Sequence, residues 1–320
     1  MFSEERFIKC ATYDGPDELP ILFSALPAAY LRYGKKLNWL LAKYPDIVDP
    51  HSINFEFERD CPPRYRKGVY TDDWGCVWHN ERDGFDAIVR GHPIPDRKGI
   101  LTYEPPAALS GHLPHGFMYL RILDLRGFDE AMLDFAEEPE ELAILLEMVT
   151  TANVRFVESL CRERRDRMLF FGDDLGMQNG LAIGAAKWRK WLKPCFTRIY
   201  DVCRAYGRFV YMHTDGQIFE IMPDLHEAGV HMINPQYRAN GIDNLVRVCK
   251  GKIPICLDLD RQLFPYATPA ELKAYVEGTV ASLWLREGGL AINLEVSPEV
   301  PLENIEALLS ALDALRSYTA

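Results

Sequence analysis

The second half of the chain carries five apolar runs, each typical of a buried strand, and each run ends in a polar motif before a helix-like stretch. The runs are MLFFGDD (168–174), FVYMHTD (209–215), VHMINPQ (230–236), IPICLDLD (253–260) and LAINLEV (290–296). Continuous apolar runs are typical of parallel strands that helices cover on both faces. The pattern therefore predicts a parallel α/β fold.

The first half supplies three more candidate strands, at 20–26 (PILFSAL), 52–57 (SINFEF) and 117–123 (FMYLRIL), which makes eight. Between the strands, apolar residues recur at helical spacing. The predicted helices cover 28–43, a segment starting at Glu138, 186–206, 218–228, 242–249, 269–286 and 302–317. Over 320 residues, this order predicts a single domain, residues 1–320, that forms one eight-stranded β/α barrel of the TIM type.

Residues 61–106 interrupt this rhythm, because they are rich in Pro, Gly, Trp and charge and contain only short strand-like pieces. We interpret the segment as an inserted hairpin and loop layer over the C-terminal mouth of the barrel. Its motif TDDWGCVWHN contains Trp74 and Trp78, which could wall a pocket for a flat substrate. A hydrophobic contact between the hairpin and the barrel is the structural alternative.

Polar residues at the ends of the five strands are the main candidates for chemistry. In a barrel of parallel strands, the C-terminal strand ends converge on one mouth, where such enzymes place their active sites. Adjacent carboxylates on a strand face opposite ways, so one of Asp173 and Asp174 is expected in the pocket and the other in a turn or cap. The residues predicted to share the pocket are Asp173, Asp174, His213, Asp215, Asn234, Gln236, Asp258 and Glu295.

His213 and Asp215 lie two residues apart and therefore share one face of an extended strand. An imidazole beside a carboxylate can bind a divalent metal, and Glu295 is a candidate third ligand from the last strand. The same pair could instead act in general acid–base catalysis. A histidine held by polar neighbours at the barrel rim is the structural alternative.

Further side chains are candidates for holding a substrate beside that pair. Amides can orient a carbonyl or carboxylate, although they can equally cap the loop around Pro235. For Asp258, the structural alternative is an ion pair with Arg238 or Arg261. The candidates for substrate binding are Trp74, Gln178, Asn234, Gln236 and Asp258.

Composition narrows the function classes. The formal net charge is −11 and the chain has no long basic run, so nucleic acid is not an expected partner. The N-terminal segment has no signal-peptide core, and no apolar run approaches membrane-spanning length. The eight cysteines include no CxxC pair, which is typical of reduced thiols in a cytoplasmic protein. No GxGxxG, Walker A, GxSxG or HExxH motif supports nucleotide binding or hydrolase chemistry.

Several segments resemble the uroporphyrinogen decarboxylase superfamily, in the order in which the family carries them. They are DDWGCVW, LRGFDEAMLDFAEEPEEL, FFGDDLGMQNG, HTDG followed by PDLHEAGVHMINPQ, and the closing P-x-V-P-x-E-N-I. The resemblance covers roughly residue 20 to the C-terminus and implies the same barrel. The superfamily contains decarboxylases of the tetrapyrrole pathway, and methyltransferases that pass methyl groups to or from corrinoid proteins.

The motifs DDWGCVW and GDDLG resemble the methyltransferase branch, and two departures from the family patterns bear on the expected chemistry. The RQAGRY-type motif by which the decarboxylases hold propionate groups is absent from the N-terminal segment ERFIKCATYDGPDELPI. The zinc-dependent, thiol-methylating members carry His-x-Cys after the fifth strand and another Cys late in the chain. Here the histidine is His213, but Asp215 replaces that cysteine and Glu295 ends the last strand. Histidine with carboxylates forms a harder site, which suits oxygen substrates.

The resemblance therefore implies a methyltransferase that moves a methyl group from a small methylated or methoxylated compound to a corrinoid held by a partner protein. A divalent metal, expected to be zinc, would bind His213, Asp215 and Glu295 and polarise the leaving oxygen, while Asp173 or Asp174 assists proton transfer. Two alternatives stay open: a decarboxylase of the uroporphyrinogen type, in which an Asp stabilises a cationic ring, and a non-catalytic barrel that only binds a ligand.

Overall fold

A computed structural model describes residues 3–109 and 115–317 of the chain. Contacts within the chain divide it into two compact units. Unit 1 comprises Met1–Gly68, Asn80–Ile88 and Gln236–Ala320, and unit 2 comprises Val69–His79 and Val89–Pro235. Each unit contains three parallel strands of the kind that the apolar runs predicted.

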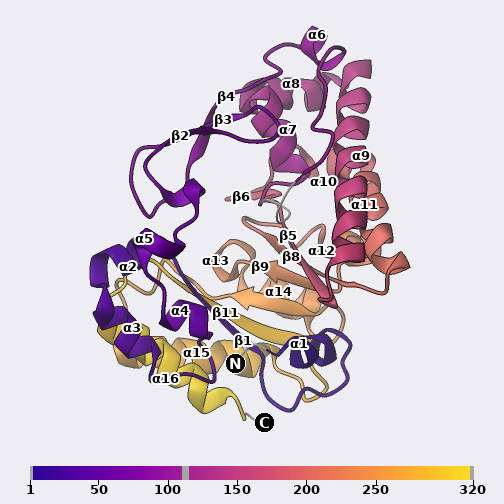
Figure 1. The fold of residues 1–320 in the computed structure, drawn as a ribbon. Coiled ribbons are helices and arrows are strands. Elements are labelled where there is room, and N and C mark those ends of the chain that lie inside the picture. Colours follow the sequence, from indigo (N-terminus) through magenta and orange to yellow (C-terminus); the bar gives the residue numbers. More distant parts are fainter. Residues whose placement is uncertain (1–2, 110–114, 318–320) are drawn as a thin grey trace. The chain divides into compact units, whose positions relative to one another are not determined.

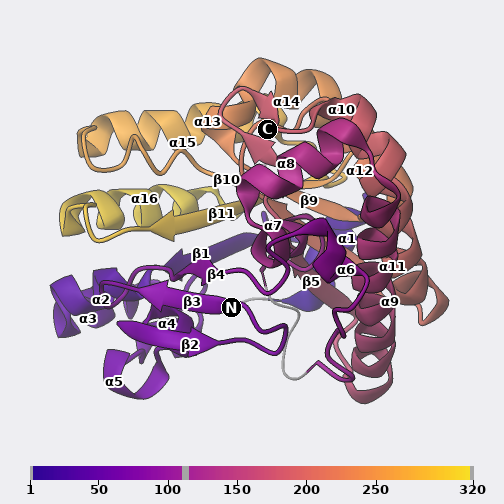
Figure 2. The ribbon, with the colours of Figure 1, turned by 90° about the horizontal axis from the view of Figure 1, so that it is seen from above.

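In unit 1, the parallel strands lie in the order β1 (Ile21–Ala25), β11 (Leu290–Val296), β10 (Ile255–Asp258). All four residues of β10 are buried, as expected for a strand covered on both faces. Helices α15 (Pro269–Leu283) and α16 (Leu302–Leu315) lie side by side (Figure 2). The remaining helices of unit 1 are α1 (Glu4–Ala11), α2 (Pro27–Tyr33), α3 (Lys35–Leu41), α4 (Pro50–Ile53), α5 (Phe57–Asp60), the 3-10 helix Pro63–Tyr65, α13 (Tyr237–Asn240) and α14 (Ile242–Cys249).

In unit 2, the parallel strands lie in the order β5 (Met168–Gly172), β8 (Phe209–Thr214), β9 (Met232–Pro235). Helices α9 (Glu140–Glu163) and α11 (Lys193–Ala205) lie side by side in Figure 1. The buried ring of Phe171 packs against Tyr200 of α11, with ring centroids 5.1 Å apart. Side chains alternate along a strand, so Phe170, Gly172, Tyr211 and His213 share the opposite face.

Shorter elements complete unit 2. They are α6 (Arg97–Ile100), α7 (Tyr119–Arg126), α8 (Phe128–Glu137), the hairpin strands β6 (Gly176–Met177) and β7 (Gly180–Leu181), α10 (Gly184–Lys187), a π-helical turn at Trp188–Leu192, and α12 (Met222–Ala228). The predicted insertion contains β2 (Gly68–Thr71), β3 (Val77–Asn80) and β4 (Ile88–Gly91), which form a separate three-stranded sheet.

Six of the eight predicted strands are strands, and two predictions were wrong. Residues 52–57 form the end of α4, the turn after it and the first residue of α5, because Asp49 accepts hydrogen bonds from the backbone N–H groups of His51 and Ser52 and so caps α4. Residues 117–123 fall mostly in α7, because the carboxylate of Asp173 accepts hydrogen bonds from the backbone N–H groups at the start of that helix.

The fold is therefore α/β with six parallel strands among the described residues, and a closed eight-stranded barrel is not shown. The single-domain assignment stays a prediction. Within residues 3–109 and 115–317, no helix is long and apolar enough to cross a membrane.

Candidate functional site

Two histidines and two aspartates of unit 2 converge where β5 and β8 end. The Nε2 atom of His115 lies 3.0 Å from Oδ1 of Asp174. The Nε2 atom of His213 lies 3.2 Å from Oδ1 of Asp215 and 4.0 Å from Oδ1 of Asp174. The two imidazole centroids are 5.5 Å apart. We call His115, Asp174, His213 and Asp215 the His–Asp cluster.

The loops that follow β5 and β8 pack against each other through two glycines, and this contact positions both aspartates. The backbone N–H of Gly176 donates to the carbonyl of Asp215 at 3.1 Å. A Cβ on Gly216, which has φ +83°, would lie 2.2 Å from the backbone of Gly176. Any side chain at either position would push the loops apart. The motifs GDDLG and HTDG therefore form one structural element.

Gly172 makes room for His115, the member of the cluster that the strand pattern did not reveal. A Cβ at position 172 would lie 2.4 Å from Nδ1 of His115, so the imidazole rests on the bare backbone of β5. The backbone N–H of Gly116 also donates to the carbonyl of Gly172 at 2.7 Å. His115 follows a segment without a strand pattern, and the sequence alone carries no signal that would have placed it here.

The structure distinguishes the roles of Asp173 and Asp174. The carboxylate of Asp173 is fully buried and accepts hydrogen bonds from three successive backbone N–H groups, those of Met118, Tyr119 and Leu120, at 3.2, 2.5 and 2.8 Å. It therefore caps the start of α7. Burial raises the pKa of Asp173 to about 7, against the opposing effect of the hydrogen bonds from Leu120 and Tyr119.

Asp174 is the carboxylate that enters the cluster. Burial disfavours its ionised form, but the hydrogen bond from His115 and the nearby imidazoles outweigh that effect, so the pKa of Asp174 lies below its usual value. The backbone N–H of Asp215 also donates to its Oδ1 at 3.1 Å. Asp174 is therefore an ionised, partly exposed acceptor at neutral pH.

Asn234 orients the imidazole of His213 through a hydrogen bond at Nδ1. The strand register places Gly172, His213 and Asn234 side by side across β5, β8 and β9. Nδ1 of His213 lies 2.8 Å from Oδ1 of Asn234, so Nδ1–H donates to the amide oxygen. That bond directs the Nε2 lone pair toward the two aspartates, as expected for a histidine that binds a metal or a proton.

The His–Asp cluster has the composition and spacing of a metal site. Ligand atoms of His115, Asp174 and His213 all lie within 4.8 Å of one another, and Asp215 adds a fourth donor beside His213. Imidazole nitrogen with carboxylate oxygen suits a divalent ion of borderline to hard character, such as zinc. The hydrogen bond from His213 to Asn234 supplies the outer support that metal-binding histidines usually have.

Trp74 and Gln178 lie outside the cluster. The ring of Trp74 is buried beneath the guanidinium of Arg121, whose Cζ lies 5.4 Å from the ring centroid. The carboxylate of Asp72 accepts hydrogen bonds from Arg121 and from the indole N–H of Trp78. The contacts of the two tryptophans therefore stabilise the inserted segment. Gln178 is exposed in the turn between β6 and β7.

The other three predicted residues belong to unit 1, and each has partners there. Glu295 forms an ion pair with Arg261. Asp258 is buried, accepts a hydrogen bond from Asn293 and forms an isolated β-bridge with Gln236. Of the three metal ligands predicted from the sequence, His213 and Asp215 belong to the cluster. His115 and Asp174 supply further ligand atoms within unit 2.

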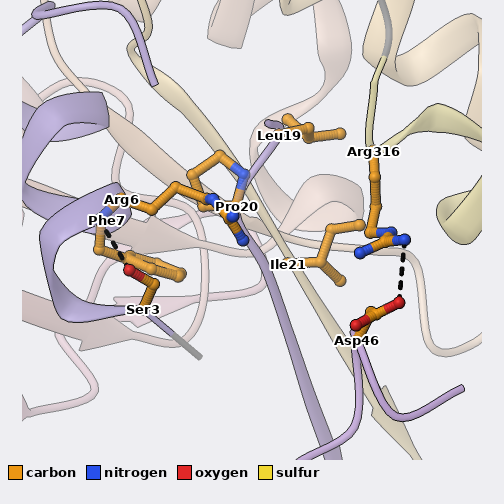
Figure 3. A pocket seen from close by; sticks show the side chains of 8 residues that line it. All are labelled: Ser3, Arg6, Phe7, Leu19, Pro20, Ile21, Asp46 and Arg316. Atoms are coloured by element: carbon orange, nitrogen blue, oxygen red, sulfur yellow. Dashed lines mark hydrogen bonds and ion pairs between the residues drawn. The ribbon is translucent and has the colours of Figure 1, made fainter. Parts of the chain in front are cut away.

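Unit 1 also contains pockets, at the opposite end of its strands. A cavity of about 10 Å³, shown in Figure 3, lies where β1 begins, and Arg316 there pairs with Asp46 at 3.1 Å. A wider cleft of about 760 Å³ borders it and is lined by Tyr13, Trp284 and Arg316, among others. Enzymes of parallel β/α architecture place their chemistry at the C-terminal strand ends instead, so we assign the site to the His–Asp cluster.

Two of the solved structures that resemble the chain are distant from it in sequence. One is a glycosylated endo-β-1,4-xylanase of glycoside hydrolase family 10 from Gloeophyllum trabeum, with 11% identity over 62% of this chain and 74% of that chain, and a TM-score of 0.40. Another is Xanthomonas albilineans dihydropteroate synthase with 4-aminobenzoic acid, with 14% identity over 49% and 54% and a TM-score of 0.31. These similarities are too weak to carry an argument about function.

A search among curated proteins found no significant match. The family model of uroporphyrinogen decarboxylase (URO-D), by contrast, matches residues 122–315. The match includes β5, β8 and the strands that follow them, and therefore Asp174, His213 and Asp215. Over more than half of its length the sequence fits this model, and the chain belongs to the uroporphyrinogen decarboxylase family.

Proposed function

We propose that the protein is a metal-dependent methyltransferase that takes a methyl group from the oxygen of a small methoxylated compound and passes it to a corrinoid held by a partner protein. Membership of the URO-D family supports an enzyme of the decarboxylase or methyltransferase type. The observation that carries the narrower proposal is the His–Asp cluster, a set of nitrogen and oxygen donors that suits a metal facing an oxygen substrate.

His115, Asp174 and His213 would hold the ion, with Asp215 as a fourth donor. A bound divalent ion would act as a Lewis acid on the ether oxygen of the substrate. The methyl–oxygen bond breaks with its electron pair left on oxygen, and the reduced corrinoid supplies the pair for the new bond to the methyl group. The oxygen then takes a proton from water.

The protein's own residues prepare this step in three ways. Asn234 fixes the imidazole of His213, so that Nε2 faces the reacting oxygen. Asp174 stays ionised because its pKa is lowered, so it contributes a fixed negative charge. Asp215 has the more exposed of the two cluster carboxylates, with 39% of its side chain accessible against 30% for Asp174, and it offers the proton a route from water.

Metal analysis tests this proposal directly. Protein purified without chelator is expected to contain about one divalent ion per chain, and zinc is the first candidate. The variants His115→Ala and His213→Ala should each lose most of that metal while their circular dichroism stays unchanged. Both side chains are partly exposed and leave no large core cavity.

His226→Ala is the matched control, because His226 is an exposed histidine of unit 2 that lies outside the cluster, and its Nδ1–H donates to the carbonyl of Val230 at 2.9 Å. This variant should keep its metal. Stoichiometric metal in His213→Ala, or equal loss in His226→Ala, would overturn the assignment.

A further inference from the structure

The face of unit 2 that carries the His–Asp cluster also carries an exposed aromatic ring. Phe170 is 49% exposed, although it lies in a strand whose neighbours Leu169 and Phe171 are buried. Its partner in the strand register is Tyr211, and the two ring centroids are 5.4 Å apart. Phe170 is therefore not an isolated exposed ring: with Tyr211 it forms an aromatic pair on the face that carries the cluster.

Both rings lie close to the cluster along their strands. Phe170 precedes Gly172 by two residues, and Tyr211 precedes His213 by two residues, so all four positions share one face. The separation along each strand is about 7 Å. An aromatic ring that stacks on Phe170 and Tyr211 would therefore place a ring substituent near Nε2 of His213.

Charge restricts what can bind on this face. None of the residues of β5 (MLFFG), β8 (FVYMHT) and β9 (MINP) is Lys or Arg, while Asp174 and Asp215 stand at the strand ends. Arg167 contacts the ring of Phe209, at the opposite end of β8 from His213. A divalent ion held by the cluster would be balanced by these two carboxylates. A carboxylate on the substrate would therefore gain no net attraction here, and it would find no Lys or Arg partner within these strands.

We infer that the substrate is an uncharged methyl aryl ether, whose ring stacks on Phe170 and Tyr211. This inference rests on the proposed function and names its substrate class. Leaving-group chemistry agrees with it, because the oxygen keeps the bonding electron pair when the methyl group departs. A phenol has a pKa of about 10, as the tyrosine side chain does, against about 15.7 for water, so an aryl ring stabilises the charge left on oxygen.

Binding of three small ethers tests the inference without any turnover. Methoxybenzene is the probe, methoxycyclohexane has the same ether but no aromatic ring, and 4-methoxybenzoate adds one negative charge. Ligand-observed NMR titrations on the full-length protein, with and without added zinc, measure each Kd. Methoxybenzene should bind about three- to tenfold more tightly than methoxycyclohexane, since aromatic contacts add to burial. The benzoate should bind more weakly than methoxybenzene.

Variants of Phe170 assign that preference to the ring. Phe170→Leu keeps an apolar side chain and should abolish the preference for methoxybenzene, whereas Phe170→Tyr should retain it. Phe128→Leu is the matched control, because Phe128 in α8 is 48% exposed and lies outside the site. A folded Phe170→Leu protein should keep its metal, because Phe170 is not a ligand.

Equal affinities for the two neutral ethers, no binding of methoxybenzene up to its solubility limit, or equal effects of the Phe170 and Phe128 variants would overturn the inference. Each of these results leaves the metal analysis of His213→Ala unaffected. Failure of the substrate class is therefore distinguishable from failure of the proposed function.

Discussion

A single missing side chain, at Gly172, lets His115 reach Asp174. We predict that Gly172→Ala displaces the imidazole, because the added Cβ would lie 2.4 Å from Nδ1 and 3.2 Å from Cε1 and Cγ. Loss of one ligand should lower the affinity of the cluster for its metal by about tenfold or more. Competition with a chromogenic chelator measures that affinity in the variant and the natural protein.

Gly278→Ala is the control for this substitution. Gly278 lies inside α15, where an added Cβ meets no atom within 4 Å, so that variant should keep its metal affinity. Alanine should also stabilise the helix by up to about 1 kcal/mol. Unchanged metal affinity in Gly172→Ala would show that His115 does not contribute to the site.

At the scale of an element, the start of α7 depends on the carboxylate of Asp173. Met118, the first residue whose N–H donates to it, lies 55 residues earlier in the chain. Asp173→Ala leaves the backbone N–H groups of Met118, Tyr119 and Leu120 without their acceptor. We predict a loss of about 2 kcal/mol in the free energy of unfolding, as for other buried caps. Urea denaturation measures this loss, and a change below about 0.5 kcal/mol would contradict the assigned role.

The same carboxyl predicts a direction for the pH dependence of stability. Its pKa is about 7 in the folded protein, whereas an unfolded Asp has a pKa of about 3.9. The folded state therefore holds the proton more tightly, and this contribution to stability is present below the unfolded value and lost as the pH rises through about 7. Asp173→Asn cannot titrate, so the stability of the natural protein relative to it should fall as the pH rises from about 4 to about 7.

The helix α7 could not be predicted from its own residues. Its residues FMYLRIL suit a strand as well as a helix, and the decision comes from Asp173, which is distant in the sequence. The six confirmed strands were predictable because each carries its own apolar run. For the same reason His213 and Asp215 were paired correctly, whereas His115 depends on a fit against Gly172 that no local pattern encodes.

At the scale of the whole molecule, charge argues against tetrapyrrole decarboxylation. Enzymes of that type must neutralise several substrate carboxylates, which favours arginine clusters. This chain has a formal net charge of −11 and no arginine-rich N-terminal motif. The first helix carries Arg6, and that side chain pairs with Asp17 and Glu18.

We therefore predict no appreciable turnover of uroporphyrinogen by the zinc-loaded protein, and methyl transfer to a reduced corrinoid protein when a methyl aryl ether is supplied. Chromatography of porphyrins after oxidation measures the first activity, and the change in corrinoid absorbance measures the second. His213→Ala should abolish methyl transfer and His226→Ala should not, since only His213 belongs to the cluster. Efficient formation of coproporphyrinogen would overturn the proposed function, because a decarboxylase of that kind needs cationic partners that the His–Asp cluster does not provide.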